Sequence, residues 1–473
     1  MGYGKLLEAL NMPKVVINKL LNSDSEENIA IDVNRIARSI ALIDTLINSQ
    51  LNVIIHHQKL QLLESSWRGL KALTFSSAGI KNIKIRVLNI KWSELSRDLS
   101  RAIEFDQSQL FHKIYNQEFD MPGGTPYGVI LADFEIHLAR QKGSKYNDLS
   151  TIEELSHIAA AAFCPIICAA SPSLLGINSF SELSSPINFY EVVRQKEFIE
   201  WRKLRDQEDV RFVALTLPRF IIRKPYTNEF TQLGNIKFKE SLQDTSDYLW
   251  ANGCYAVGTV LIREYASVNW FSHIEGSPRD QVAGGIIDCF NCGDFLTDSP
   301  NINNKILTEV LVTDAKEKEL SQLGFISLCH CYDSDLMAIH SYSSIQNSKN
   351  FTNEQTNENA RLSAMLQHIL CASRFAHYIK VIIRDKIGSF VNARRCEEDL
   401  QKWLNEYASG RDDLSWELQA RYPLREAKVR VSETVASAGK FSCDIFLKPH
   451  YTASHLVAEL KLNTELVKTN VIN

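Results

Sequence analysis

Hydrophobic and polar positions alternate most clearly along residues 359–388, NARLSAMLQHILCASRFAHYIKVIIRDKIG. Apolar side chains recur there at three- and four-residue steps, interrupted only by Ser373: Leu362, Leu366, Ile369, Ala376, Ile379, Ile383 and Ile387. A second face of the same helix carries a basic row: Arg374, His377, Lys380 and Arg384. The pattern predicts one helix of about 45 Å, ended near Gly388, because an α-helix rises 1.5 Å per residue. The basic row must face a partner or solvent.

Elsewhere the pattern alternates between strand and helix periods, which predicts a mixed α/β (α+β) core with mixed sheets flanked by helices. Strands are expected at 83–90, 128–132, 166–170, 210–218 and 306–313. Helices are expected at 64–73, 149–162, 197–206, 250–265 and 314–320. The first fifty residues read as two short helices joined by a polar loop at 22–28.

The C-terminal part predicts a helix at 394–407 and three strands at 428–432, 441–447 and 456–462. Little helix is left to cover them, so their edges need a partner. A polar stretch at 343–358 reads as a linker. The expected divisions are an N-terminal helical extension at 1–60, an α/β body with an inserted outer domain at 61–342, the linker, a helical region at 359–425 and C-terminal strands at 426–473.

Composition indicates a globular chain, with 45% hydrophobic and 23% charged residues. The net charge of −4 gives no overall attraction to nucleic acid or to an anionic membrane, and neither is expected as a partner. The longest apolar run, 158–170, is too short to span a bilayer and contains Pro165. No signal peptide is visible, so a cytoplasmic location is expected, and ten cysteines in so long a chain fit reduced thiols.

Motifs for chemistry are missing from the sequence. The Gly-Lys pair Gly439-Lys440 precedes Phe441 in a predicted turn, so it forms no phosphate loop. No dinucleotide fingerprint, nucleophile elbow or HExxH motif occurs. We expect no catalytic residue and no cofactor.

Four cysteines are the best candidates for a metal site: Cys289, Cys292, Cys329 and Cys331. The second pair is too tightly spaced for an ordinary zinc knuckle, and alternation places it on one buried face of a strand, so ordinary thiols are favoured. Adjacent His56 and His57 point in different directions on a regular element. Asp133 and Glu135 favour a capped loop after a strand over a divalent-cation site. The basic row itself has a plain alternative, a solvated helix face.

Several short sequence motifs together resemble one family, the large subunit of the contractile sheath of bacterial type VI secretion systems (the TssC/VipB family). They occur in the family's order: LESSWRGL at 63–70, RFVALTLPR at 211–219, WANG at 250–253, TDAKEKELSQLGF at 313–325, NARLS at 359–363, SRFAHY at 373–378, RDKIGSF at 384–390 and KPHY at 448–451. The resemblance covers roughly residues 60–455.

The resemblance implies a structural protein with a contractile-tail-sheath core and terminal extensions that pair with neighbouring subunits. Its implied partners are an obligate small sheath subunit, neighbouring protomers, hexamers of an inner tube, a baseplate and an AAA+ unfoldase that recycles the contracted sheath. Contraction drives the tube and its spike outward, and the energy resides in the sheath lattice. No active site is needed.

The resemblance also suggests contacts. The basic row Arg374, His377, Lys380 and Arg384 would meet the tube. Inter-subunit strand exchange would use Val429, Val431, Phe441, Ile445, Leu447, Leu456 and Leu460, and the unfoldase would bind a helix containing Val15, Val16, Lys19 and Leu20. Two alternatives stay open: a sheath subunit of another phage-tail-like contractile particle, and an α/β enzyme with a dispersed site.

Overall fold

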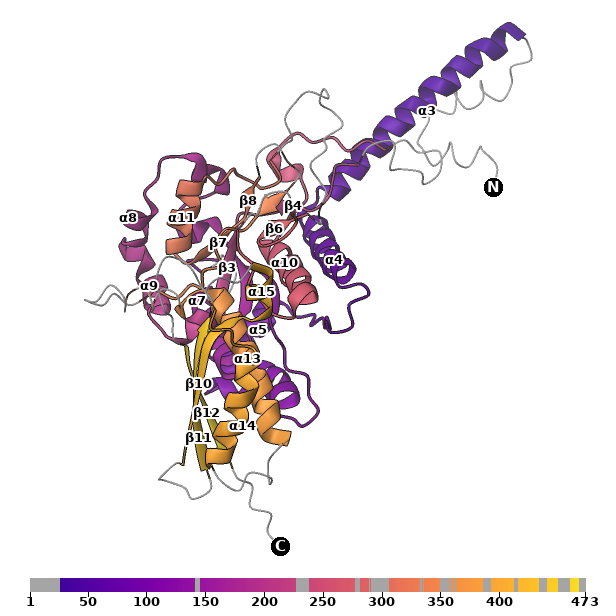
Figure 1. Cartoon of the computed structure of the whole chain (residues 1–473). Helices are drawn as coiled ribbons and strands as arrows, with labels where there is room; N and C mark the ends of the chain where they lie inside the picture. Colours follow the sequence, from indigo (N-terminus) through magenta and orange to yellow (C-terminus); the bar gives the residue numbers. More distant parts are fainter. Residues whose placement is uncertain are drawn as a thin grey trace. The chain divides into compact units, whose positions relative to one another are not determined.

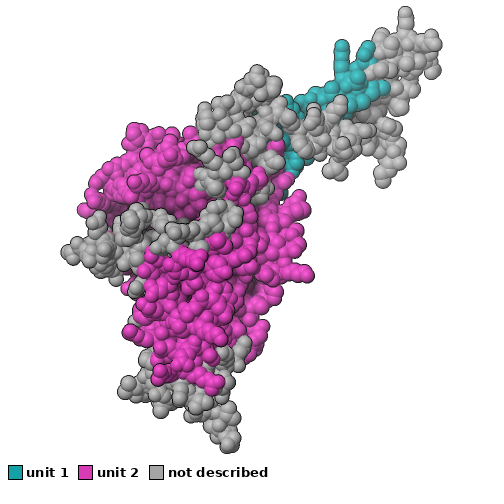
Figure 2. All heavy atoms as spheres, in the orientation of Figure 1, with its two compact units in different colours: residues 1–64, 225–249 teal, residues 65–224, 250–473 magenta. Residues whose placement is uncertain are grey.

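The computed structural model describes residues 26–140, 145–226, 238–276, 281–288, 306–331, 336–348, 363–385, 393–411, 416–433, 440–449 and 460–467, with a few single residues between them. The chain divides into two compact units (Figure 2). Unit 1 comprises residues 1–64 and 225–249, and unit 2 comprises residues 65–224 and 250–473.

Helices and strands alternate through unit 2, whereas α3 and the start of α4 belong to unit 1 (Figure 1). The α-helices are α3 (Glu26–Ile55), α4 (Gln58–Ser76), α5 (Trp92–Arg101), α6 (Gln109–Phe111), α7 (Asp148–Ala161), α8 (Phe189–Val193), α9 (Ile199–Arg205), α10 (Gly253–Val268), α11 (Asp314–Gln322), α13 (Leu366–Asp385), α14 (Ala393–Asn405) and α15 (Trp416–Arg421). A π-helix, η2, spans His112–Phe119.

The strands are β1 (Ile130–Ile136), β2 (Ile166–Ala170), β3 (Val213–Leu217), β4 (Phe220–Ile221), β5 (Trp250–Ala251), β6 (Ile286–Ile287), β7 (Phe325–Ser327), β8 (Cys329–His330), β9 (Met337–Ala338), β10 (Leu424–Glu433), β11 (Lys440–Pro449) and β12 (Leu460–Val467). Short 3₁₀ turns are η1 (Phe105–Gln107), η3 (Pro172–Leu175), η4 (Phe180–Ser184), η5 (Lys196–Phe198), η6 (Asp209–Phe212) and η7 (Thr245–Asp247).

The main sheet of unit 2 is parallel, in the order β1-β2-β3-β7. Every residue of β2 and β3 is buried, as expected for central strands with both faces covered. Asn147 caps α7 by accepting a hydrogen bond from the backbone N–H of Leu149, and the helix buries Ile152, Leu155 and Ile158 in the core around this sheet. The expected α/β class with several sheets is confirmed.

A glycine allows α4, from Ser65 onward, to approach α10 closely. A Cβ atom on Gly69 would lie only 2.5 Å from ring atoms of Tyr255, and one on Gly258 would lie 2.4 Å from a methyl of Leu131. Position 69, in the LESSWRGL motif, therefore favours glycine because a side chain there would overlap the Tyr255 ring.

The C-terminal elements form a second core in unit 2. Helices α13 and α14 cover one face of the antiparallel sheet β10-β11-β12 (Figure 1). Phe375 and Ile379 of α13 and Leu400 of α14 pack there against Ile445 and Leu447 of β11. The strands predicted at the end of the chain thus share a core with the long helix.

Several boundaries follow the sequence pattern closely. Strand 166–170 matches β2, and the helices expected at 149–162, 197–206 and 394–407 lie at α7, α9 and α14. The strand expected at 306–313 is wrong, because only Thr308 forms a single bridge there, to Phe220. Trp250 and Ala251, expected in a helix, form β5 instead.

The long helix is shorter than predicted. It begins at Leu366, whose N–H donates to the carbonyl of Tyr342 at 2.9 Å, while Ser343 and Met365 form a bridge. The chain before Leu366 is therefore held against the 342–344 segment, and this contact interrupts the helix that the periodicity extends back to 359. Leu362 and Ile387 lie outside the described residues. Leu366, Ile369, Ile379 and Ile383 are buried as expected.

Unit 1 contains α3, the start of α4 and residues 238–249. α3 begins at Glu26, so residues 26–28, which were expected in the polar loop at 22–28, are helical. His56 lies between two carboxylates: its Nε2 is 3.1 Å from Glu240 and its Nδ1 is 3.7 Å from Asp247. These contacts fasten the C-terminal end of α3 to the 238–249 segment.

Candidate functional sites

The basic row of α13 faces a segment of its own chain. Lys380 Nζ lies 2.9 Å from the Asp120 carboxylate and 3.8 Å from the centroid of the Phe119 ring. Arg384 Nη1 donates to the carbonyl of Met121 at 2.9 Å. Two of the four predicted tube-contact cations therefore bind the end of η2 and the turn after it.

Arg374 is held between two tyrosines. Its guanidinium lies 5.0 Å from the ring centroid of Tyr265 and 4.7 Å from that of Tyr378. It also donates to both hydroxyls, at 2.5 and 2.8 Å. Arg374 thus connects α13 to α10 through cation–π contacts and hydrogen bonds.

His377 is buried, with 4% of its surface exposed. Its Nε2 donates to the carbonyl of Ala162 at 3.0 Å, and its ring lies 5.4 Å from that of Phe119. Burial lowers the pKa of His377 to about 4, so its imidazole is neutral near pH 7. The expectation that His377 shares an exposed basic face is wrong, because η2 and the end of α7 cover that part of the helix.

The π-helix η2 supplies the covering surface. Phe111 and Tyr115 stack with ring centroids 4.8 Å apart, and Tyr115 continues to Phe119 at 5.2 Å. π-helical turns are rare and are often found at functional places in proteins. The sequence interpretation missed this segment, although Phe111, Tyr115 and Phe119 recur at four-residue steps and could have indicated an apolar helix face.

The predicted strand-exchange residues lie in or near the C-terminal sheet. Val429, Ile445 and Leu447 are buried against α13 and α14, and Val431 packs partly on the same core. Phe441 pairs with Glu433 and Leu466, while Leu460 pairs with Leu447. Leu456 lies outside the described residues, and the third strand extends to Val467, beyond its predicted end at 462. Among the described residues, the outer edges of β10 and β12 pair with no other strand.

The predicted unfoldase-recognised residues Val15, Val16, Lys19 and Leu20 lie outside the described residues.

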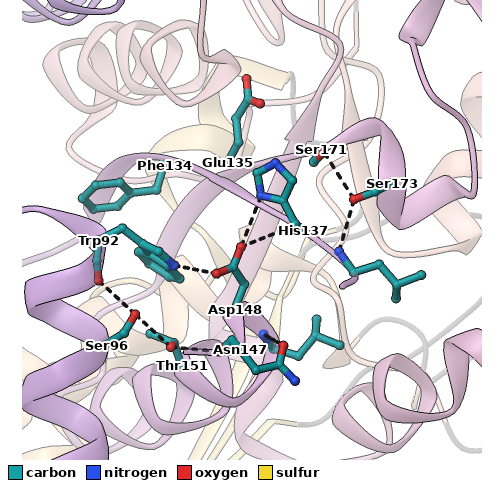
Figure 3. Close-up of polar contacts among 12 residues, drawn as sticks. Trp92, Ser96, Phe134, Glu135, His137, Asn147, Asp148, Thr151, Ser171 and Ser173 are labelled. Carbon is teal, nitrogen blue, oxygen red and sulfur yellow. Dashed lines mark hydrogen bonds and ion pairs between the residues drawn. The ribbon is translucent and has the colours of Figure 1, made fainter. Parts of the chain in front are cut away.

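A polar cluster lies at the carboxyl edge of the parallel sheet, where enzymes of open α/β folds place their sites. Figure 3 shows the buried carboxylate of Asp148 between the Trp92 ring and His137. Asp148 accepts from Trp92 Nε1 at 2.7 Å and from the His137 N–H at 3.1 Å, and His137 Nδ1 lies 3.2 Å away. The carboxylate therefore ties α5 and the end of β1 to the start of α7.

Two serines in the same view serve the loop after β2 (Figure 3). Ser173 Oγ accepts from the backbone N–H of Leu138 at 3.2 Å and donates to Ser171 Oγ at 3.3 Å. These contacts join neighbouring loops.

Asp133 and Glu135 lie within β1, so the expected capped loop after a strand is wrong. Tyr255 donates its hydroxyl to Asp133 at 2.9 Å, and Ser66 also bonds that carboxylate. Glu135 binds the Arg219 guanidinium through two bonds of 2.5 and 2.9 Å, in a fork-to-fork geometry. Both carboxylates are therefore used to connect β1 with α4, α10 and the end of β3.

The cysteines that the structure describes are free thiols. Cys329 is buried in β8, and burial raises its pKa to about 12, while Cys331 is half-buried. Cys289 and Cys292 lie outside the described residues. Within the described part of the chain, no group of three or more His, Cys, Asp or Glu side chains is placed to hold a metal ion. The helices of that part include none with the length and apolarity to cross a membrane.

Comparisons with known proteins cover most of the chain. Residues 37–346 match the family described as EvpB/VC_A0108, tail sheath N-terminal domain, and residues 355–466 match EvpB/VC_A0108, tail sheath gpW/gp25-like domain. The type VI secretion system sheath protein TssC1 of Pseudomonas aeruginosa is 35% identical over 439 residues, covering 92% of this chain and 86% of that protein. The resemblance seen in the sequence words is confirmed, and this chain belongs to the EvpB/VC_A0108 tail sheath family, the sheath proteins of type VI secretion.

Proposed function

We propose that this chain is the large subunit of a type VI contractile sheath, which pairs with a small sheath subunit and polymerises as a helix around an inner tube. The observation that carries the proposal is the match of both tail sheath domains, in order, within one chain whose relative is named a type VI sheath protein. The role is structural, in the cytoplasm, and energy for the stroke is stored in the lattice rather than supplied by catalysis.

The C-terminal sheet supports assembly. On β10, Gln401 and Glu397 of α14 bond the backbone of Ala427, Val429 and Val431. Among the described residues no further strand pairs with the outer edge of β12, and such edges accept strands from other chains. A head-to-tail contact of this kind, repeated without closing, generates an open helix. The core that α13 and α14 share with the sheet buries one face of β10 and β11.

The tube-contact proposal keeps Arg374, Lys380 and Arg384 and drops His377. Each of the three is partly exposed while it also binds its own chain, and the Lys380 side chain is 25% exposed. Modest, screened contacts suit a sheath that must move along the tube.

Charge reversal separates a tube contact from a role within the chain. We expect Arg384→Glu to reduce the amount of tube protein retained in purified sheaths, more at low salt than at high salt, while sheaths still form. Unchanged retention of the tube would count against the contact. Lys203→Glu, an exposed cation on α9, is the matched control.

The remaining partners, a baseplate and a recycling AAA+ unfoldase, belong to the same proposal. Deleting residues 1–25, which contain Val15, Val16, Lys19 and Leu20, tests the unfoldase contact: contracted sheaths of the deleted chain should resist disassembly by the unfoldase and ATP.

Co-expression with the small sheath subunit tests the assembly itself. Both chains should sediment together as particles far larger than a heterodimer in the ultracentrifuge. A compact oligomer of this chain alone, with no bound small subunit, would favour an enzyme. Polymers that form without any small subunit would favour a simpler phage-tail-like sheath.

A further inference from the structure

Residues 82–90, between α4 and α5, have the pattern of a strand but do not pair as one. The sequence NIKIRVLNI alternates, and residues 83–90 form neither helix nor strand in the structure. From Asn82 to Ile90 no backbone hydrogen bond reaches another described residue. Backbone donors and acceptors over these nine residues therefore have no backbone partner in the part of the chain that the structure describes.

The chain itself holds this segment in place. Arg86 binds Glu118 and donates to the Tyr127 hydroxyl at 3.2 Å and to Thr125 at 3.1 Å. At the other end, Ile90 and Trp92 pack on the core of the parallel sheet, with the Trp92 ring 5.1 Å from that of Phe134. Contacts within the chain therefore anchor the segment before any partner arrives, which lowers the entropy cost of pairing.

Two large apolar side chains of the segment face solvent. Val87 is 67% exposed and Leu88 is 53% exposed. The preceding helix adds Trp67 and Phe75, which are 64% and 69% exposed. Exposed apolar side chains on a segment without a backbone partner among the described residues are typical of a contact that is completed by another chain.

The charged residues within the stretch 65–93 are all of one sign. From Ser65 to Ser93 the chain has no Asp or Glu and six cations: Arg68, Lys71, Lys81, Lys84, Arg86 and Lys91. The whole chain has a net charge of −4, so this stretch departs strongly from the average. Lys81, Lys84 and Lys91 are exposed and form no ion pair with another described residue. The complementary partner is acidic.

We infer that residues 82–90 accept an acidic, extended strand of the small sheath subunit by backbone pairing, in addition to any exchange at the C-terminal sheet. The inference rests on the proposed function, because it takes that subunit as the occupant. Main-chain hydrogen bonds give the contact its affinity, and the lysines select a strand with Asp or Glu at alternate positions.

Amide hydrogen exchange on the co-expressed, assembled pair tests the inference without a mutation. Residues 82–90 have no backbone partner among the described residues of their own chain, so exchange that slows there on assembly, relative to the chain alone, indicates a partner from outside. We expect the peptide covering 82–91 to exchange about 100-fold more slowly than an unstructured peptide. Full exchange within seconds in the assembled pair overturns the inference.

Adjacent prolines test the pairing mode. In a strand, the N–H groups of Val87 and Leu88 point to opposite edges, so only one of them can face the partner. We expect one of Val87→Pro and Leu88→Pro to block binding of the small subunit and the other to retain most of it. Equal retention by both variants contradicts backbone pairing.

A charge-reversed pair with a matched control tests the chemistry of the occupant. Lys84→Glu with Lys91→Glu should weaken capture of the small subunit about tenfold, whereas Lys196→Glu with Lys203→Glu, which are also exposed but lie on other elements, should not. Equal loss in both pairs overturns the inference, since the effect would then follow net charge. If the unaltered chain captures no small subunit, the proposed function fails. If it does and the Lys84/Lys91 pair binds equally well, only this inference fails.

Discussion

The Nζ atom of Lys380 lies 3.8 Å from the centroid of the Phe119 ring and 2.9 Å from the carboxylate of the adjacent Asp120. Lys380 belongs to the helix that forms the C-terminal core, and Phe119 ends the π-helix beside the parallel-sheet core. The single side chain therefore joins two hydrophobic cores of unit 2. A face that its sequence spacing marks as a partner surface serves first as an internal contact.

Lys380→Ala should lower the free energy of unfolding by about 1 kcal/mol, because a cation–π contact of this kind contributes about 0.5–2 kcal/mol. Asp120→Asn should cost less than about 0.5 kcal/mol, since the Asp120 side chain is 60% exposed and its ion pair is screened. Urea unfolding of Lys380→Ala, of Phe119→Leu and of the double variant gives the coupling free energy between the ring and the ammonium. Asp120→Asn is measured in the same way. Additive losses would show that the ring and the ammonium do not interact.

His377 should make stability depend on acid. Burial lowers its pKa to about 4 in the folded chain from 6.5, so the unfolded chain binds the extra proton between these values. The contribution of the neutral imidazole to the free energy of unfolding is complete above pH 6.5. It is lost as the pH falls toward 4, by at most about 1.4 kcal/mol per pH unit. His377→Gln keeps a donor for the Ala162 carbonyl and removes this slope. Unfolding curves at pH 7 and 5 compare the two, and parallel pH profiles would contradict the buried, neutral imidazole.

Glu264 should give stability the opposite dependence on pH. Burial raises the pKa of this carboxyl in α10 from 4.5 to about 7, against the opposing charge of Arg263. Its contribution is complete below pH 4.5 and is lost as the pH rises through 7, because only the folded chain keeps the proton. Glu264→Gln should therefore gain stability relative to the unaltered chain between pH 5 and 8. A constant difference over that range would show that Glu264 ionises normally.

Gly69→Ala should destabilise the chain by about 1–3 kcal/mol, since the new methyl would meet the Tyr255 ring at 2.5 Å. Helix propensity alone predicts the reverse, a gain of about 1 kcal/mol. Thermal unfolding decides between them, with Thr74→Ala on the exposed face of α4 as the control. A raised melting temperature in Gly69→Ala would contradict the close packing of α4 on α10.

The local sequence pattern was sufficient to predict elements that pack on the core along their whole length. β2 and α7 follow their apolar runs almost residue for residue, because the core fixes every position of such elements. The short sequence motifs also identified the correct family, the type VI sheath proteins. Residues 83–90 show the limit of the pattern, since alternation specifies an extended backbone but not the strand that pairs with it.

The basic row shows a second limit. Spacing places Arg374, His377 and Lys380 toward one side of a helix, but the group that covers His377 comes from Ala162, more than two hundred residues earlier. Periodicity therefore identifies a face and not its neighbour. The start of α13 is similar, because the backbone of Tyr342 and Ser343 decides it through contacts that no helical pattern contains.

Electron microscopy of the chain purified with its small sheath subunit tests the central claim most directly. The account predicts long tubes of helical symmetry in which both chains are present in equal numbers. Compact, closed oligomers of fixed size in the same preparation, with no tubes at any salt concentration, would contradict it.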